Sequence, residues 1–283
     1  MLAITLALGS SLLWGLADFA GGLKSRSYAV AVVLAIMYLT SLVAMGIFVG
    51  ARGEGPPASE ALLAGLGAGL FGIAALMAFY RALSIGTMSI VAPVASTGVA
   101  LPVLVGLATG DQPGLLRSLG LVAAVVGVIL ASREEPGGSD DRRLARQSVV
   151  LAIVAGLGFG MYFVLAEISS RDDIGWALLL SRMAASPFIV AFALLALRGG
   201  ARRPGLRELA IIAGIGLLDL GANVLYNTST TLGELSTVAV ASSLYPVTTV
   251  LLAAALLGER VRGVQRTGVV IALFGVVLIA AGT

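Results

Sequence analysis

Long apolar runs alternate with short polar segments along almost the whole chain. A membrane-spanning helix needs roughly 20 consecutive apolar residues. Ten runs meet this requirement, at about 2–22, 29–50, 60–80, 87–109, 114–132, 148–169, 174–197, 206–230, 236–257 and 263–282. They are longer than barrel strands and do not alternate apolar with polar positions, so they indicate helices. The pattern predicts an all-α polytopic membrane protein with ten transmembrane helices.

One hydrophilic linker, 133–147, divides these runs into two sets of five, in segments 1–132 and 148–283. The two segments share residues at a nearly constant offset. The matches are Gly15 with Gly160, Tyr80 with Tyr226, Gly86 with Gly233, Gly120 with Gly268, and Gly127 with Gly275. Such self-similarity indicates an internal repeat. Because five is odd, the second copy enters the membrane from the opposite side, which predicts two inverted five-helix repeats.

Composition supports a membrane protein and excludes several other classes. Hydrophobic residues make up 58% of the chain and charged residues only 12%, which is too little polar material to cover a soluble surface. The net charge is +3, but the basic residues are scattered between apolar runs, so nucleic-acid binding is not expected. Most of them follow the odd-numbered runs, and the positive-inside rule therefore places both termini outside the cytoplasm.

Several chemistries lack the residues that they need. The chain has no cysteine and no histidine, which excludes disulfides, thiolate chemistry and imidazole-bound metal. The single lysine, Lys24, is not part of a Walker A motif, so nucleotide hydrolysis is not expected. No nucleophile triad, metal set or carboxylate pair is evident. We expect no enzyme activity, no metal and no cofactor.

Three segments carry a resemblance to a known family. They are LGSSLLWG in the first run, SRMAASPFIVAFALL in the seventh, and GELSTVAVASSLYPVTTVLLAAALLGERVRGVQRTGVVIALFGVVLI near the end. With these segments the chain resembles the EamA-type transporters of the drug/metabolite transporter superfamily. The first half departs from the pattern, with Gly98 where the second has Pro246 and Asp111 where it has Glu259. The resemblance implies a secondary transporter from a family that exports amino acids and other metabolites. It also implies cytoplasmic termini, contrary to the charge count.

The eighth run contains an unusual polar stripe. Asp219, Asn223, Tyr226 and Thr230 are spaced i, i+4, i+7 and i+11, which places them on one face of a helix. A polar face in a membrane helix is directed at protein or water and not at lipid. The stripe lines a cavity or pairs with neighbouring helices, and four different polar groups favour the cavity.

Other candidates flank this stripe. The substrate-site candidates on other runs are Trp14, Tyr80, Tyr162, Ser243 and Tyr245, and the candidate helix breaks are Pro93, Pro102 and Pro246. Proline removes a helical hydrogen bond, and interrupted spans in both halves are typical of a midplane transport site. Single aromatic residues in spans are more often packing or interface anchors than cavity walls. Asp18 and Glu167 lie near the ends of their runs, where the side chain reaches water at little cost, so a functional role is not favoured for either.

Arg182 and Asp219 are predicted to form an ion pair. Arg182 lies eight residues inside the seventh run and Asp219 eleven residues from the end of the eighth. Both lie more than about 10 Å from the same boundary at the helical rise of about 1.5 Å per residue. Neither charge is expected to remain unpaired in hydrocarbon. The pair is either structural or part of coupling.

These observations lead us to expect a transporter in the inner cell membrane. Its substrate is a small polar or amphipathic metabolite such as an amino acid, its direction is export, and access alternates at the repeat interface. We expect the lipid bilayer and possible coupling protons as its other partners, and a monomer or weak homodimer. The alternatives are a lipid-carrier flippase and a non-transporting assembly partner. The polar stripe argues against the assembly partner, and the single deep arginine argues against the flippase.

Overall fold

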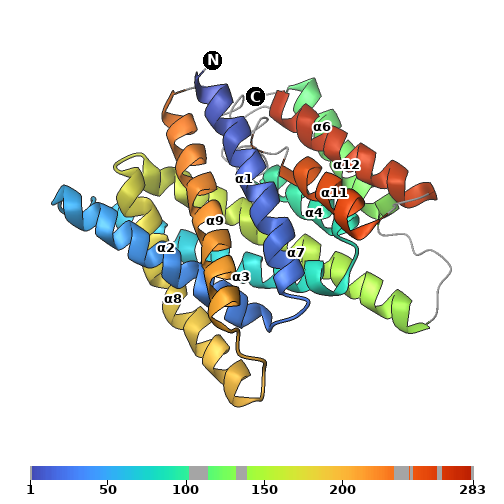
Figure 1. The fold of residues 1–283 in the computed structure, drawn as a ribbon. Helices are drawn as coiled ribbons and strands as arrows, with labels where there is room; N and C mark the ends of the chain where they lie inside the picture. Colours follow the sequence, from blue (N-terminus) through green and yellow to red (C-terminus); the bar gives the residue numbers. More distant parts are fainter. Residues whose placement is uncertain are drawn as a thin grey trace.

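Helices account for the regular structure of the protein (Figure 1). The computed structural model describes residues 2–101, 114–131, 139–232, 242, 245–259 and 263–281, and no strand occurs in these ranges. The elements are α1 (Leu2–Lys24), α2 (Val30–Arg52), α3 (Ser59–Ile85), α4 (Met88–Ser96), the 3₁₀ helix η1 (Thr97–Val99), α6 (Leu115–Ala131), α7 (Ser139–Ser170), α8 (Ile174–Arg198), α9 (Leu206–Leu232), α11 (Tyr245–Leu257) and α12 (Gly263–Ala281).

Six of these helices are long and apolar enough to cross a membrane. They are α1, α2, α3, the Arg142–Ser170 part of α7, α8 and α9. Large apolar side chains such as Val43, Ile47, Leu63 and Phe188 are exposed on their outer surfaces, as expected where lipid replaces water as the solvent. The prediction of an all-helical membrane protein is confirmed, whereas the number of ten spans stays a prediction.

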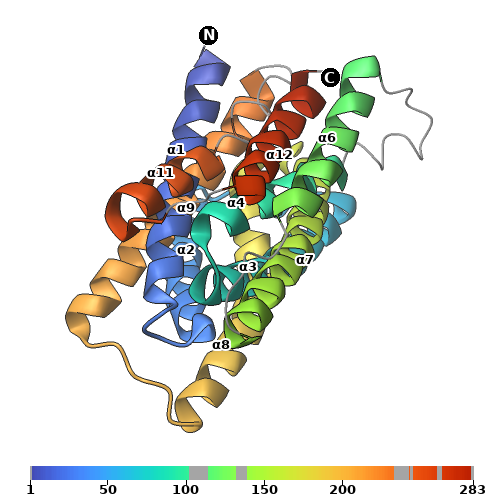
Figure 2. The same ribbon diagram turned by 90° about the vertical axis from the view of Figure 1, so that its right-hand side faces the viewer.

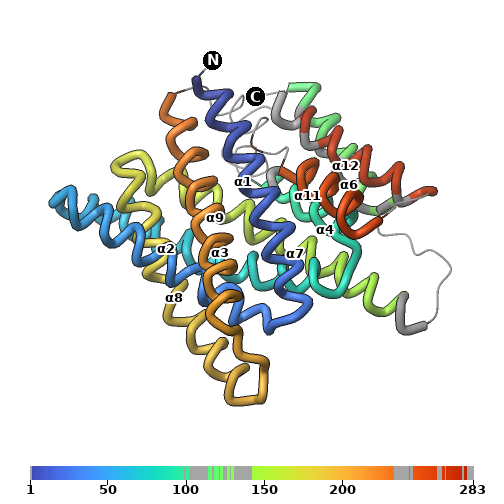
Figure 3. The backbone as a smooth tube through the Cα atoms, in the orientation of Figure 1, coloured from blue at the N-terminus to red at the C-terminus, as the bar shows by residue number. Residues whose placement is uncertain are grey.

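The main helix pairings join the first half of the chain to the second. Helix α1 packs along α9, α3 along α7, α2 against α8, and α6 against α12. The views in Figures 1 and 2, related by a quarter turn, both show α6 beside α12. The start of α1 and the end of α12 lie at the same end of the molecule in these views. The backbone trace in Figure 3 shows α1 and α9 crossing the molecule side by side.

Glycines allow these helices to approach closely. A Cβ atom on Gly69 of α3 would overlap the carbonyl group of Ser181 on α8, and one on Gly216 of α9 would lie 2.7 Å from the carbonyl oxygen of Met37 on α2. The same holds for α1 and α7. A Cβ on Gly15 would lie 2.7 Å from the Tyr245 carbonyl oxygen, and one on Gly160 would lie 2.5 Å from that of Gly98. Small residues at such crossings are typical of membrane helix packing.

The predicted helix breaks differ from one another. Pro93 lies inside α4, which gives way to η1 at Thr97. The Ser96 hydroxyl donates to the Pro93 carbonyl at 2.8 Å, so a side chain satisfies a backbone group near the break. Pro246 is the second residue of α11 as described, and the two residues before α11 lie outside the described ranges. Pro102 lies outside the described residues.

Polar contacts tie helix ends together. Asp173 caps α8 by accepting a hydrogen bond from the Trp176 N–H at 2.7 Å, and its other carboxylate oxygen lies 2.8 Å from Arg52 Nη2 at the end of α2. Partial burial alone would raise the pKa of Asp173, but the hydrogen bonds from Arg52 and Trp176 lower it below its usual value. The ends of α2 and α8 are thereby fixed to each other.

Candidate functional site

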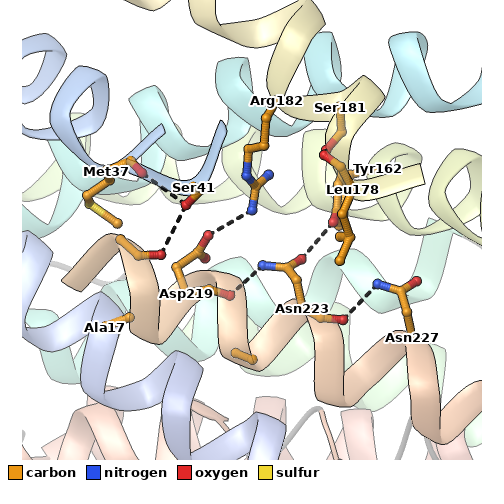
Figure 4. A network of polar contacts seen from close by, with 12 residues as sticks. Ala17, Met37, Ser41, Tyr162, Leu178, Ser181, Arg182, Asp219, Asn223 and Asn227 are labelled. Atoms are coloured by element: carbon orange, nitrogen blue, oxygen red, sulfur yellow. Dashed lines mark hydrogen bonds and ion pairs between the residues drawn. The ribbon is translucent and has the colours of Figure 1, made fainter. Parts of the chain in front are cut away.

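A ladder of buried polar side chains runs along α9 (Figure 4). Asp219, Asn223 and Asn227 repeat every four residues and are all buried. The amide of Asn223 donates to the Asp219 carbonyl at 2.7 Å, and the amide of Asn227 donates to the Asn223 carbonyl at 2.8 Å. The side-chain oxygen of each asparagine accepts from α7: Asn223 from the Tyr162 hydroxyl at 2.7 Å, and Asn227 from the Ser170 hydroxyl at 2.8 Å.

Arg182 of α8 pairs with Asp219 at the end of this ladder. Arg182 Nη2 lies 3.0 Å from Asp219 Oδ2, and both side chains are almost fully buried. The guanidinium group also stacks over the ring of Tyr38 on α2, 4.6 Å from its centroid. Its Nε atom has no hydrogen-bond partner among the described residues. The structure therefore brings together the two residues that were expected to pair, because α8 and α9 both present them to the interior.

Aromatic side chains gather beside the ladder. The ring of Trp14 on α1 contacts the rings of Phe163, Tyr226 and Tyr245, with centroid distances of 6.0, 5.5 and 6.4 Å. Phe163 also contacts Tyr162 at 5.5 Å and Tyr226 at 5.4 Å. Helices α1, α7, α9 and α11 all contribute to this aromatic cluster, which we define as Trp14, Tyr162, Phe163, Tyr226 and Tyr245.

A cavity lies between the charged pair and the aromatic cluster. Its empty volume is about 540 Å³, including the part that is open to the surroundings. Both halves of the chain line it, with Trp14, Asp18, Tyr38, Gly72 and Leu76 from the first and Phe159, Tyr162, Phe163, Arg182, Asp219, Asn223 and Tyr245 from the second. Mostly apolar walls with a few convergent polar groups are typical of small-molecule sites.

Most, but not all, of the predicted site residues line the cavity. Asp219, Asn223, Trp14, Tyr162 and Tyr245 line the cavity. Tyr226 is not among the lining residues but contacts Trp14 and Phe163 in the aromatic cluster. Ser243 lies outside the described residues.

Two other predicted polar residues take packing roles. Tyr80 is fully buried against α1, where its hydroxyl donates to the Ala17 carbonyl at 3.3 Å. Thr230, the last residue of the predicted stripe, donates to the Asn227 carbonyl at 2.8 Å. Neither residue is among those that line the cavity.

Sequence reasoning expected Asp18 to reach water near the end of its helix, but the structure places Asp18 in the cavity wall. Its side chain is only 6% exposed. The signal was present in the sequence, since Trp14 and Asp18 are four residues apart and share one face of α1. The position of Asp18 in the run suggested contact with water, but Tyr80 and its neighbours on α3 close that end of the helix. Asn227 was also missed, although it extends the same four-residue spacing.

No group of three acidic side chains gathers as a metal site in the part of the chain that the structure describes. The arrangement instead offers a charged pair, one further carboxylate, amide and hydroxyl groups, and aromatic walls. It is suited to binding a small molecule that has both polar and apolar parts.

Comparisons with known proteins agree with this description. One solved crystal structure of another protein is similar, with a TM-score of 0.63 and 17% sequence identity over 98% of this chain and 96% of the other, which shows a shared fold. A search of the curated proteins gives no match. The model of the EamA-like transporter family matches residues 1–133 and 146–281, in two successive segments. The chain therefore belongs to the EamA-like transporter family, a family of membrane transporters.

Proposed function

We propose that the protein is a secondary transporter, and specifically an exporter in the inner cell membrane, for a small polar or amphipathic metabolite such as an amino acid. The observation that carries this proposal is the cavity between the two halves, with buried charged groups and aromatic walls. A buried ion pair within membrane-spanning helices is expensive and is typical of a substrate or ion pathway.

The proposal includes an inverted repeat of two five-helix units, 1–132 and 148–283, joined by the linker 133–147. Gly69 and Gly216 are 147 residues apart in the sequence, and each brings its helix against a carbonyl group of the other half. Gly15 and Gly160, 145 residues apart, do the same. The pairing of α1 with α9 corresponds in this scheme to the pairing of α7 with α3. These correspondences support two related units.

Alternating access follows from such an arrangement. If the two units rock against each other around the cavity, its opening moves from one side of the membrane to the other while the binding groups stay in place. The cavity-lining residues from both halves would then contact the substrate in each state.

Counterflow in proteoliposomes tests the proposal. Liposomes containing the purified protein are loaded with unlabelled amino acids, sugars, nucleosides or organic amines, and uptake of the same labelled compound is measured. We expect exchange of at least one compound above that of empty liposomes. Asn223→Ala should reduce it by at least about 10-fold, as expected when a buried polar group of a binding site is left unpaired.

Val224→Ala is the matched control for this variant. Val224 is the next residue of α9, is exposed and is not among the residues that line the cavity, so its truncation should leave exchange unchanged. Equal exchange by the Asn223→Ala and Val224→Ala variants would show that the pathway does not use this cavity. No exchange of any compound class would contradict transport of small metabolites.

A further inference from the structure

Asp18 is a buried carboxylate that takes no part in the Arg182–Asp219 ion pair of the site. Its side chain is 6% exposed, and it lines the cavity. It makes no hydrogen bond and no ion pair with any residue that the structure describes. A carboxylate in the interior of a membrane protein is stable only when a positive group or a proton accompanies it.

The groups around Asp18 do not supply that positive charge. Asp219 of α9, Tyr80 of α3 and Tyr245 of α11 are its titratable neighbours. The Tyr80 hydroxyl donates to the carbonyl of Ala17 and not to Asp18. Arg182 of α8, the basic residue that lines the cavity, is held by Asp219.

Arg182 is further occupied by Tyr38 of α2, over whose ring it stacks. Tyr162 of α7, the remaining titratable group of the cavity wall, donates to Asn223. Among the residues that the structure describes, the cavity therefore holds two carboxylates against one guanidinium group, and Asp18 is the carboxylate without a partner.

The walls of the cavity that Asp18 lines also favour a positive group. Half of the residues that line the cavity are aromatic: Trp14, Tyr38, Phe159, Tyr162, Phe163 and Tyr245. The faces of aromatic rings attract cations, most strongly where water is excluded. The carboxylate and the rings together form a site for an ammonium group that is attached to an apolar body.

We propose that Asp18 binds the ammonium group of the transported molecule, so that the cargo is an amphipathic organic amine, a class that includes amino acids with apolar side chains. This inference rests on the proposed function, because it assigns the chemistry of the cargo in the same cavity. The apolar part of the cargo packs against the aromatic walls, and its amine takes the place of the missing counter-ion.

Binding to the purified full-length protein in detergent tests the proposal. The probes are phenethylamine, its neutral analogue 2-phenylethanol and the anionic 3-phenylpropionate, which share an aromatic body and differ in charge. Affinity is measured from the rise of the melting temperature with ligand concentration, since a ligand that binds only the folded state stabilises it. We expect phenethylamine alone to stabilise the wild-type protein.

The Asp18→Asn variant should bind phenethylamine more weakly by about 30-fold or more, the loss expected when one partner of a buried charge pair is removed. Asp172→Asn makes the same change at an exposed position in the α7–α8 turn and should bind as the wild type does. Because Asp18 has no partner to lose, its substitution should not lower the melting temperature of the ligand-free protein. Wild-type affinity for phenethylamine in the Asp18→Asn variant would overturn the proposal.

The wild-type binding series and the exchange assay also test the ammonium site when the Asp18→Asn variant cannot be measured. If the Asp18→Asn variant does not fold, the wild-type series decides alone, and equal affinity for the amine and the alcohol overturns the proposal. Exchange of solutes without an amine in proteoliposomes, with no binding of phenethylamine, would refute this inference and leave transport standing. Amine binding that depends on Asp18, without exchange of any solute, would support the ammonium site and contradict the proposed transport.

Discussion

At the scale of single residues, the site contains few buried charged and polar side chains, and most of them have identified partners. Arg182 has two partners, the carboxylate of Asp219 and the ring of Tyr38. Asn223 is fixed from both ends, because its amide donates along α9 and its oxygen accepts from Tyr162. These contacts hold the polar groups in one geometry around the cavity, so a substrate meets a preformed surface.

The Arg182–Asp219 pair gives a prediction at this scale. Arg182→Gln or Asp219→Asn alone should lower the free energy of unfolding by about 3–5 kcal/mol, because each leaves a buried charge without its partner. The double variant should lose less than the sum of the two. Detergent-induced unfolding of the four proteins measures the difference.

The exposed pair Glu167 and Arg171 is the matched control. Glu167 lies in the last turn of α7 and Arg171 in the turn just after it. They are four residues apart and are 41% and 69% exposed, so the same double-variant cycle should give a coupling of only about 0.3–0.5 kcal/mol. If the losses for Arg182→Gln and Asp219→Asn add, the coupling free energy between the two side chains is zero and the ion pair does not stabilise the fold.

The sequence was informative about helix faces and much less so about what covers them. The four-residue spacing placed Asp219 and Asn223 on one face, and the structure has both in the cavity wall. The same reasoning could not show that Tyr80 packs into Gly21 of α1 or that Asp18 faces the cavity. Periodicity gives the direction of a side chain about its own helix, but its neighbour is set by tertiary packing that one sequence does not encode locally.

At the scale of helices, close crossings determine where the cavity wall is formed. Gly69 sets α3 against α8 next to Arg182, and Gly216 sets α9 against α2 one turn before Asp219. The hydroxyl of Ser41 on α2 donates to the Gly216 carbonyl at 3.1 Å and reinforces the second crossing. The glycines and the charged pair are therefore adjacent parts of one interface, which α2, α3, α8 and α9 build together.

Alanine substitutions should distinguish glycines that are needed for packing from those that are not. Gly69→Ala would place a methyl group on the Ser181 carbonyl and should lower the free energy of unfolding by about 1–3 kcal/mol, as overpacking does. Gly46→Ala on α2 meets no atom within 4 Å. It should stabilise the protein by about 0.5–1 kcal/mol through helix propensity. Thermal unfolding of both variants measures this contrast, and a neutral Gly69→Ala would show that α3 and α8 separate easily.

At the scale of the whole molecule, the two halves are linked by charges at one end. Arg26, in the turn after α1, lies 3.2 Å from Glu259 Oε1, just beyond α11. The other oxygen of Glu259 accepts from the backbone N–H and the hydroxyl of Ser89 at 3.0 and 3.2 Å. Arg26 also donates to the carbonyl of Gly86 at 3.4 Å. We define these contacts of Arg26, Glu259, Ser89 and Gly86 as the end latch.

The end latch ties the ends of α1 and α3 and the start of α4, in the first half, to the end of α11 in the second, and none of its residues lines the cavity. Under alternating access, this end must separate whenever the cavity opens there. Surface ion pairs contribute only about 0–1 kcal/mol, so the latch is weak enough to open during each cycle. Its closure in the present structure is consistent with access from the opposite end.

Reversible cross-linking of the latch gives the prediction for the whole molecule. The chain has no cysteine, so Arg26→Cys combined with Glu259→Cys introduces a unique thiol pair, and a short disulfide-forming bifunctional reagent can join it. Cross-linking should reduce exchange in proteoliposomes to the level of empty liposomes while ligand binding from the other end persists. A reductant should restore exchange, because the uncross-linked halves can separate again. Thiols at Glu167, in the last turn of α7, and at Arg171, just after it, form the matched control, since both lie in the second half and joining them constrains no motion between halves. Full exchange by a completely cross-linked latch would show that this end does not open during transport.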